Sequence, residues 1–488
     1  MKKIIGIFVL TAFCAFSFAQ GDYEAFRFTQ TEISGTARFM GAGGAFSTTG
    51  GEFSALSLNP AAIGLYKRHE VTLTPMSLIF SNNTSKYYGT NTLAKNPKYT
   101  VPECGLVINS KIENSNWKSW QFGFGYNRIM DFNNTLRADA QNVNNSMVNA
   151  ILRHAQGTPY TALAGDAGLF WSTWVIDTFS NQPDHYYSPF ENKELNHSAL
   201  VEQSGAIDEI SLSFGGNFQD KLYIGASLGI PIIDYKERIT YSEAMSNELV
   251  VGDYLTSFQT VATQHDAGGG INLKLGIIYQ PVNFLRIGAG FQTPTYYWKI
   301  KDTYDREMVA QYLENDNTIT NSKTWSYTNR NNFTLTTPLK FNIGATFLIK
   351  KRAFISAEYN FCDFGMANLY SNEYNYTMEN QAVKDKYGIC HTLRVGAEVN
   401  LAPQFALRAG YNFKSSPYKL TSGPYNGSAH YASLGLGFKS KYFFADLAYV
   451  LKLSKDSFWL YEGNNPAVSA VEYENTTHRI VATIGCKF

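Results

Sequence analysis

The sequence predicts an all-β protein, a transmembrane antiparallel β-barrel of about fourteen strands with an N-terminal plug in its lumen. Three observations predict this fold. Apolar and polar residues alternate along many segments, the composition combines many aromatic residues with few charges, and short connections alternate with long ones. Together these features are typical of a bacterial outer-membrane barrel.

Alternation with a period of two is the strongest signal. In Leu339–Ile349 the odd positions are Leu, Phe, Ile, Ala, Phe and Ile, and the residues between them are mainly polar or glycine. The same alternation occurs in Leu222–Ile230, Leu393–Leu401 and Phe405–Phe413. Such a pattern gives a strand one face for an apolar medium and one for a polar medium.

Strand length and the connections distinguish a membrane barrel from a soluble sandwich, which shows the same period. The predicted strands are 69–80, 101–113, 118–132, 205–218, 221–236, 267–281, 284–301, 333–349, 352–362, 390–402, 404–414, 428–439, 442–453 and 475–488. Tight connections fall near 114–117, 219–220, 282–283, 350–351, 403 and 440–441. Long ones fall at 81–100, 133–204, 237–266, 302–332, 363–389, 415–427 and 454–474. Short periplasmic turns at one rim and long extracellular loops at the other are typical of outer-membrane barrels.

The composition supports a barrel and excludes other classes. Aromatic residues make up 15% and charged residues 17% of the chain, yet the mean hydropathy is −0.22. Beyond the first twenty residues the sequence has no continuous apolar stretch long enough for a membrane-spanning helix. The formal net charge of +1 gives no reason to expect a nucleic-acid partner.

Residues 1–19 have the layout of a cleaved signal peptide. Lys2 and Lys3 precede the apolar run Ile4–Phe13, and Ser17–Ala19 supplies small residues at the cleavage site. Cys14 raises lipidation as an alternative, which the large residue before it disfavours. The chain also ends in an amphipathic strand whose final residue is aromatic, which resembles the assembly signal of outer-membrane proteins. We therefore predict export to the outer membrane of a Gram-negative bacterium.

The segment 20–68 does not have the pattern of a strand. Residues 34–46 are rich in glycine and alanine, and Asn59-Pro60-Ala61 follows, where Asn-Pro favours an abrupt turn. A compact irregular segment ahead of the barrel, residues 69–488, has two locations open to it, the lumen or the periplasm. We expect the lumen, where inward polar side chains can pair its backbone groups.

These residues carry a family resemblance. The chain resembles the outer-membrane long-chain fatty-acid transporter family (FadL/OmpP1/TodX), in its Bacteroidetes form. The elements that carry the resemblance are Gly41–Ala45, Ser54–Leu56, Asn59–Ala61, Pro338–Gly344, Ala357–Tyr359, Arg394–Gly396, Leu407–Tyr411 and Ser416-Pro417. The resemblance implies a monomeric barrel in outer-membrane lipid, with an N-terminal hatch that carries the Asn59-Pro60-Ala61 motif. It also implies passive uptake of a hydrophobic small-molecule ligand, such as a long-chain fatty acid or an aromatic hydrocarbon, with no cofactor.

The connection 133–204 departs from the family because it is much longer than the second loop usual there. Within it, 147–152 and 162–179 have amphipathic, helical patterns, and we expect their aromatic residues to be exposed. Phe170, Trp171 and Trp174 are therefore candidates for capturing ligand over the barrel mouth. The alternative is an ordinary cap whose aromatic side chains bury one another.

Four cysteines remain after the signal peptide. Cys362 and Cys390 flank the loop 363–389 on the lumen-facing parity, so a disulfide that closes this loop is predicted for an oxidising compartment. Cys104 and Cys486 have lipid-facing parity at opposite rims and are not expected to pair. The alternative is that all four are unpaired thiols.

Five charged residues face the lumen by parity, and two interpretations stay open. The residues are Lys340, Arg394, Glu398, Arg408 and Lys414. They form either a binding cluster for the carboxylate of an amphipathic acid or a salt-bridged wall, which a polar lumen needs in any case.

No catalytic or metal-binding pattern stands out in the sequence. Gly225–Gly229 matches G-x-S-x-G, but it lies within an alternating strand and not at a strand-to-helix elbow. The eight histidines show no metal-ligand spacing. We therefore expect a protein that is not an enzyme and holds no metal.

The rival to a transporter is a non-transporting barrel that docks protein partners of a secretion system at the outer membrane. The lumen should distinguish the two, because a transporter needs a continuous apolar pocket behind the hatch and a docking barrel does not.

Overall fold

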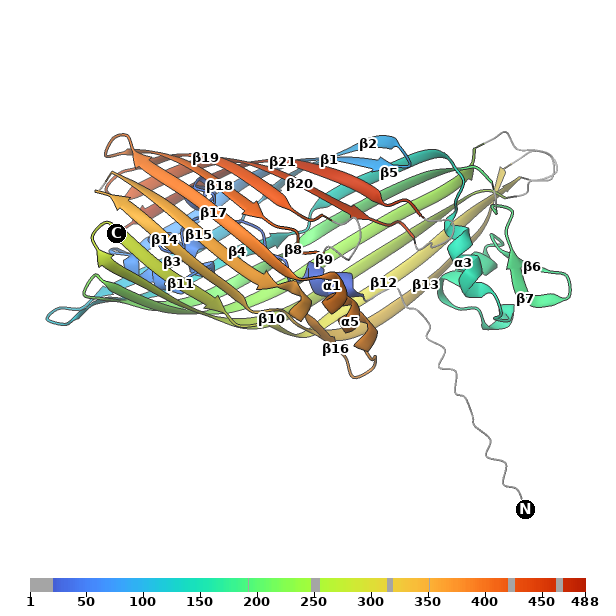
Figure 1. Cartoon of the computed structure of the whole chain (residues 1–488), viewed down its shortest axis with the longest axis horizontal. Coiled ribbons are helices and arrows are strands. Elements are labelled where there is room, and N and C mark those ends of the chain that lie inside the picture. Colours follow the sequence, from blue (N-terminus) through green and yellow to red (C-terminus); the bar gives the residue numbers. More distant parts are fainter. Residues whose placement is uncertain are drawn as a thin grey trace, which may run out of the picture.

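The computed structural model describes residues 21–191, 193–246, 255–313, 319–350, 352–419, 426–461 and 468–488. These residues form a closed barrel of fourteen antiparallel strands, five of which are interrupted by a short break (Figure 1). The last strand closes on the first, with Val71 opposite Cys486 and Leu78 opposite Ile480. The predicted fold class is confirmed. The predicted signal peptide, residues 1–19, lies outside the described residues, as do parts of the predicted loops 237–266, 302–332, 415–427 and 454–474.

Nine of the fourteen barrel strands are continuous, and each of the other five is divided into two labelled strands that lie in line. The single ones are β1 (Glu70–Tyr87), β8 (Leu195–Phe218), β9 (Leu222–Met245), β10 (Leu255–Val282), β17 (Ile389–Asn400), β18 (Phe405–Lys414), β19 (Ala429–Lys439), β20 (Phe443–Phe458) and β21 (Val471–Lys487). The paired ones are β2 (Thr90–Thr100) with β3 (Glu103–Lys111), β4 (Trp117–Asp131) with β5 (Asn134–Val143), β11 (Leu285–Gln292) with β12 (Tyr296–Leu313), β13 (Ile319–Thr336) with β14 (Lys340–Ile349), and β15 (Ala353–Asp363) with β16 (Asn368–Tyr370). Pro102, Pro294 and Pro338 lie in three of the breaks, because proline cannot donate a ladder hydrogen bond.

The strands on one side of the barrel are much longer than predicted. Residues 81–100 were expected as a loop, but β1 and β2 continue to a tight turn at Tyr88 and Gly89. The predicted loop 302–332 is likewise largely the paired strands β12 and β13. The predicted loop 133–204 begins with β5 and ends inside β8. The inward face of these extensions packs against the cap, through residues such as Ala199, Phe258 and Met308, and their outward face carries many polar residues, so the apolar outward face that marks the membrane zone is weak there.

The outward face of the barrel carries an apolar belt. Large exposed side chains on it include Phe405 at 55%, Leu434 at 62% and Leu436 at 56%. An apolar belt on a closed barrel meets the two requirements of a bilayer, satisfied backbone groups and an apolar surface. The barrel therefore belongs in an outer membrane. None of the helices among the described residues is long and apolar enough to cross a bilayer.

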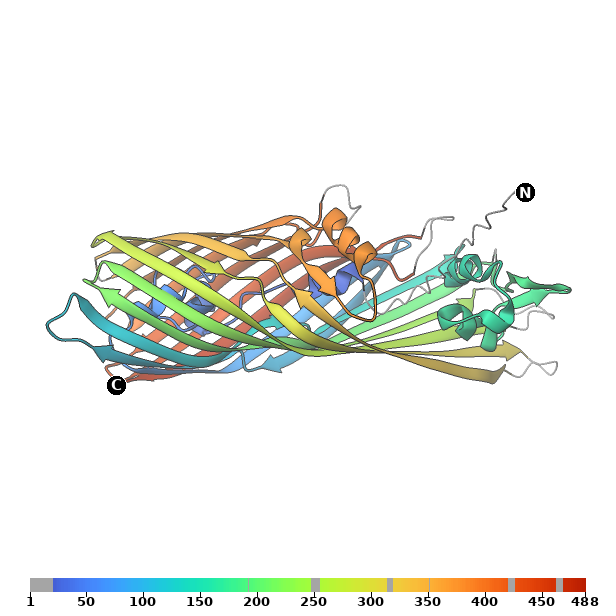
Figure 2. The ribbon, with the colours of Figure 1, turned by 90° about the horizontal axis from the view of Figure 1, so that it is seen from below.

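The N-terminal segment, residues 21–66, lies inside the barrel (Figures 1 and 2). It contains α1 (Asp22–Arg27), α2 (Ala37–Gly41) and two 3-10 helices, η1 (Ser54–Ser57) and η2 (Pro60–Leu65). The helix α2 contacts β18 to β21, and η2 contacts β4 and β8 to β10, so the segment spans the lumen from wall to wall.

Two further structured regions lie at the mouth with the long loops. The first, called the cap below, comprises α3 (Met147–Ala155), η3 (Tyr160–Ala162), α4 (Gly165–Ser172), β6 (Asp177–Phe179) and β7 (Gln182–Tyr187). It sits over the side of the barrel that has the long strands (Figure 2). The second comprises η4 (Phe364–Met366) and α5 (Thr377–Lys386). It lies beside α1 on the side of the barrel that has the shorter strands, β15 to β21, which is called the lower wall below (Figure 1).

Candidate functional site

The Asn59-Pro60-Ala61 motif fits against a patch of glycine on the inner wall. Asn59 caps η2, because its Oδ1 accepts a hydrogen bond from Ala61 N at 3.1 Å, and its Nδ2 donates to Ile277 O of β10 at 3.3 Å. A Cβ on Gly276 would overlap Asn59 Oδ1, and one on Gly225 would lie 2.7 Å from Ala61 N. These two glycines therefore let the segment's backbone approach the wall. Gly225 belongs to the G-x-S-x-G match, which serves packing here.

The lower half of the lumen holds the segment with charged side chains from the wall. Arg38 Nε lies 2.9 Å from Glu398 Oε2, and the same carboxylate accepts from Arg408 Nε at 2.7 Å. Arg408 Nη1 also lies 2.6 Å from Asp446 Oδ1. Ala37 N donates to Thr483 Oγ1 at 2.7 Å. Together with the nearly complete burial of residues 36–64, these contacts fill the lower lumen.

The helix α1 is anchored near the mouth by an aromatic cluster. Phe26 is 3% exposed and stacks on Tyr387 with ring centroids 4.5 Å apart, while Phe364 and Tyr418 contact it at 5.3 and 5.5 Å. Asp22 adds an ion pair with Lys386 at 2.6 Å. The rings hold one face of α1 against the lower wall.

The other face of α1 carries buried charge. Arg27 lies 3.5 Å from Glu237 and 4.1 Å from the centre of the Tyr235 ring. Burial raises the pKa of Glu24 to about 7, although the nearby Arg27 guanidinium opposes the shift. The helix therefore places a titratable carboxyl group between the mouth and the lumen.

Three cavities follow one another from the mouth toward the lower lumen. The outer one, here called the vestibule, has about 430 Å³, the middle one about 220 Å³ and the inner one about 140 Å³. Tyr23 and Arg27 of α1 line both the vestibule and the middle cavity. Glu32 and Lys414 line both the middle and the inner cavity. The helix α1 thus partitions a path that ends at the packed part of the segment.

The vestibule is amphipathic. Its apolar lining comes from the cap helix α3, through Met147 and Ile151, and from Phe458 at the end of β20 and Leu460 just beyond it. Its polar lining includes Arg306, whose Nε lies 3.5 Å from Asp166 of the cap. The vestibule can hold a molecule with a large apolar part.

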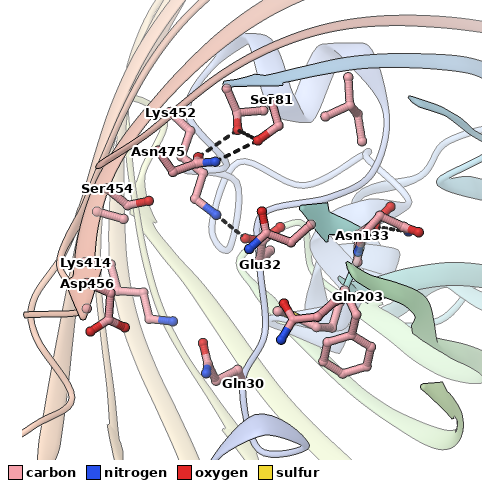
Figure 3. A pocket seen from close by; sticks show the side chains of 18 of the residues that line it. Gln30, Glu32, Ser81, Asn133, Gln203, Lys414, Lys452, Ser454, Asp456 and Asn475 are labelled. Carbon is pink, nitrogen blue, oxygen red and sulfur yellow. Dashed lines mark hydrogen bonds and ion pairs between the residues drawn. The ribbon is translucent and has the colours of Figure 1, made fainter. Parts of the chain in front are cut away.

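The middle cavity is more polar (Figure 3). Lys452 forms an ion pair with Glu32, and Asn475 donates to Ser81 Oγ at 2.6 Å. Burial raises the pKa of Glu32, but the Lys452 and Arg479 charges outweigh that effect, so the net shift is downward. Lys414 makes no ion pair within the described part of the chain, and its Nζ lies 5.9 Å from the Phe364 ring.

Of the five charged residues that were predicted to face the lumen, some form a salt-bridged wall and others are available to bind a carboxylate. Arg394 pairs with Glu358 at 2.7 Å, and Arg408 pairs with Glu398, as a salt-bridged wall requires. Lys340 donates to Thr29 O at 3.3 Å, and neither it nor Lys414 has an ion-pair partner among the described residues. These two lysines line the inner cavity together and are free to meet an anion.

The three aromatic candidates in the cap do not act as one exposed surface. Phe170 is fully buried against Phe258 at 5.3 Å, so its expected exposure is wrong. Trp171 is half-buried against Tyr160 at 5.2 Å. Trp174 is 59% exposed and has φ +61°, at the end of α4 where glycine usually takes that conformation. The aromatic residues of 162–179 were predicted to be exposed, but the cap has a buried core of its own, which takes up Phe170.

Cys362 and Cys390 lie directly opposite each other on β15 and β17. Both are buried and both are free thiols in the structure, and they line the inner cavity. The predicted disulfide stays a prediction. Cys104 and Cys486 are exposed free thiols on the outward face, but they lie on either side of the start of β1, opposite Leu73 and Val71, so their expected placement at opposite rims is wrong.

Sequence reasoning missed the role of α1. Its sequence did carry a helix signal, with Asp22 and Glu24 in the first turn and Arg27 in the last. A six-residue helix beside a segment rich in small residues is too short for the periodic pattern to stand out. Its aromatic anchors come from two loops whose contact with the N-terminus no local pattern indicates.

Comparison with known proteins agrees with this architecture. No protein-family model matches the chain, and no curated protein matches it. Among solved structures, a FadL homologue of Pseudomonas aeruginosa has a TM-score of 0.53 at 13% identity, over 94% of this chain and 99% of the other. The toluene transporter TodX of P. putida has a TM-score of 0.52 at 11% identity, over 94% and 99%.

A TodX monoaromatic hydrocarbon channel with the deltaS2 mutation has a TM-score of 0.53 at 12% identity, over 93% of this chain and 98% of the other. The chain has the FadL channel fold. These FadL-type neighbours are transport channels and not enzymes. The likeness to the Bacteroidetes form stays a prediction.

Proposed function

We propose that this protein admits hydrophobic small molecules passively through the outer membrane. The observation that carries the proposal is the series of three cavities that leads from beneath the cap to the packed N-terminal segment. The FadL channel fold supports it, because its neighbours include a toluene transporter and a monoaromatic hydrocarbon channel. Apolar surface in the vestibule favours such solutes over small polar ones by burying their area.

The N-terminal segment acts as the hatch in this proposal. It fills the lower lumen, and the Asn59-Pro60-Ala61 motif seats it against the wall through a few hydrogen bonds. Passage then requires α1, the outermost part of the hatch, to move first and the rest of the hatch to move second.

The inner cavities favour an amphipathic acid, such as a long-chain fatty acid, over a neutral aromatic hydrocarbon. They do not form the continuous apolar pocket expected of a transporter, because Lys340 and Lys414, which have no ion-pair partner among the described residues, bring positive charge into the lining. A carboxylate bound beside Lys414 would compensate that charge, while its chain contacts Ile33, Phe39 and Leu58 of the same lining.

Uptake by cells that lack their own long-chain fatty-acid channel tests the proposal. Cells that produce the protein should accumulate radiolabelled oleate faster than cells with an empty vector. Lys414→Met should reduce oleate uptake several-fold and leave toluene uptake nearly unchanged. The matched control is Lys439→Met, which removes an exposed lysine at the other end of the barrel. Uptake of neither probe above the empty vector would reject transport.

The exposed apolar groups of the cap favour a second candidate, a barrel that docks a protein partner. Trp174 and Phe179 are 59% and 50% exposed at its outer end. A partner that stays bound through detergent purification and is lost on Trp174→Ala, in a protein that takes up neither probe, would support docking.

A further inference from the structure

The outward face of the lower wall carries three copies of one polar pair within the apolar belt. In each pair a tyrosine hydroxyl meets the Nδ1 atom of a histidine on the next strand at 2.7 Å. The pairs are Tyr359 with His391, Tyr411 with His430 and Tyr449 with His478. They join β15 to β17, β18 to β19 and β20 to β21, so they repeat around one side of the barrel.

The three pairs lie at one level. Each tyrosine is the same number of residues beyond the first residue of its strand, Ala353, Phe405 or Phe443. At about 3.3 Å per residue and a tilt of about 40°, the tyrosines lie about 15 Å above the strand starts and the histidines about 5 Å higher.

The level of the histidines is the upper part of the lipid zone. An outer-membrane barrel has an apolar band about 25 Å tall. On the same face Phe413 and Leu451 lie level with His430 and His478, the next outward positions above them are Ser415 and Leu453, and Lys455 follows Leu453. The histidine rings therefore lie just below the place where the apolar belt ends, at the depth of lipid ester and headgroup oxygens.

The hydrogen bonds within the pairs leave one donor on each histidine for a lipid. When the tyrosine hydroxyl donates to Nδ1, the proton of the neutral ring is on Nε2. Within the described part of the chain these three Nε2 atoms have no hydrogen-bond partner. A donor that has no partner in an apolar medium is unfavourable, so an acceptor from the lipid stabilises each pair.

An apolar groove of about 780 Å³ lies beneath the pairs on the same face. Small outward residues, Ala397 and Ala409, form its floor, and Ile355, Leu407 and Leu436 form its sides. Tyr449 belongs both to the groove and to the third pair. The groove can therefore hold an acyl chain whose head reaches the histidines.

We infer that this face is a binding site for a phosphorylated acyl lipid of the extracellular leaflet. The acyl chain lies in the groove, and the phosphate or ester oxygens accept hydrogen bonds from the histidine Nε2 atoms. Phosphate is the preferred group because a hydrogen bond to an anionic acceptor is shorter and stronger than one to a neutral ester oxygen. The site is outside the barrel and does not depend on the proposed uptake function.

Native mass spectrometry of the delipidated barrel tests the site. The probes are bis-phosphorylated lipid A and the same lipid with both phosphates removed. The intact barrel should retain the phosphorylated probe at least tenfold better than the dephosphorylated one. The triple variant His391→Leu, His430→Leu, His478→Leu should lose that preference.

A groove-filling variant keeps the test decisive if the triple variant folds poorly. Ala397→Phe fills the groove and should weaken retention of the phosphorylated probe. Its matched control is Ala289→Phe on β11, an outward alanine that is not part of the groove. Heat-modifiable migration in electrophoresis confirms that each barrel is folded. Equal retention of both probes by the intact barrel, or unchanged retention in Ala397→Phe, would overturn the inference.

Discussion

Replacing Phe26 with alanine should release α1 from the wall without unfolding the barrel. The ring is 3% exposed and contacts three aromatic rings, and a buried Phe→Ala change costs about 3–5 kcal/mol. The lost free energy weakens the docking of α1 and not the barrel itself, because Phe26 does not belong to a barrel strand. At about 1.4 kcal/mol per factor of ten, even the lower figure raises the undocked population about 100-fold.

The native thiols beneath α1 report this opening. Cys362 and Cys390 are buried in the same aromatic core as Phe26. In a Cys104→Ser, Cys486→Ser background, after reduction, a membrane-impermeant maleimide should label these two thiols about 100-fold faster in Phe26→Ala than in the parent. Phe26→Leu keeps most of the apolar contact and should give a much smaller increase.

An unchanged labelling rate in Phe26→Ala would refute the reasoning, provided that heat-modifiable migration shows a folded barrel. It would mean that α1 does not control access to the inner cavity. Faster labelling together with a lost folded band would instead show that the ring stabilises the whole barrel, which also contradicts a local role.

Three further predictions concern the same passage. Gly276→Val should displace the hatch, because its side chain would overlap Asn59; proteolysis between residues 35 and 66 should become faster while the barrel band persists. Peptide mass spectrometry without reductant should find Cys362 linked to Cys390, and unlinked thiols would reject the disulfide. Burial raises the pKa of Glu24 to about 7, so its contribution to α1 docking is complete below about pH 4.5 and is lost as the pH rises through 7. Thiol labelling, corrected for thiolate fraction, should therefore be faster at pH 8 than at pH 5.5, and Glu24→Gln should flatten that dependence.

The membrane zone of the fold could be predicted because the bilayer imposes a simple rule on each strand. Segments such as 339–349 and 393–401 must place every second side chain in lipid, so their alternation is visible in a single sequence. Above the bilayer the outward face of β12 and β13 meets water and its side chains need not be apolar, although Met308 and Ala310 on the inward face are buried, so the rule no longer applies. The hairpins there were consequently expected as loops.

The candidate site could be predicted only where the chemistry is local. Asn59 before Pro60 indicates a capped turn whatever surrounds it, and the structure has that turn. The burial of Phe170 depends on Phe258, far away in the sequence, and the anchoring of Phe26 depends on Tyr387 and Tyr418. Contacts between residues so distant leave no period in the sequence.

The way the N-terminal segment joins the barrel bears on how the lumen can be refilled after it empties. The segment runs from α1 near the mouth down to Leu65 and continues into β1 at Glu70, so the wall holds it by a short covalent link at the lower rim. A released segment would therefore not diffuse away. A short flexible tether keeps an effective concentration of about millimolar, so return to the lumen is an intramolecular step. The closed state can therefore be restored by the protein's own N-terminal segment, without a second molecule.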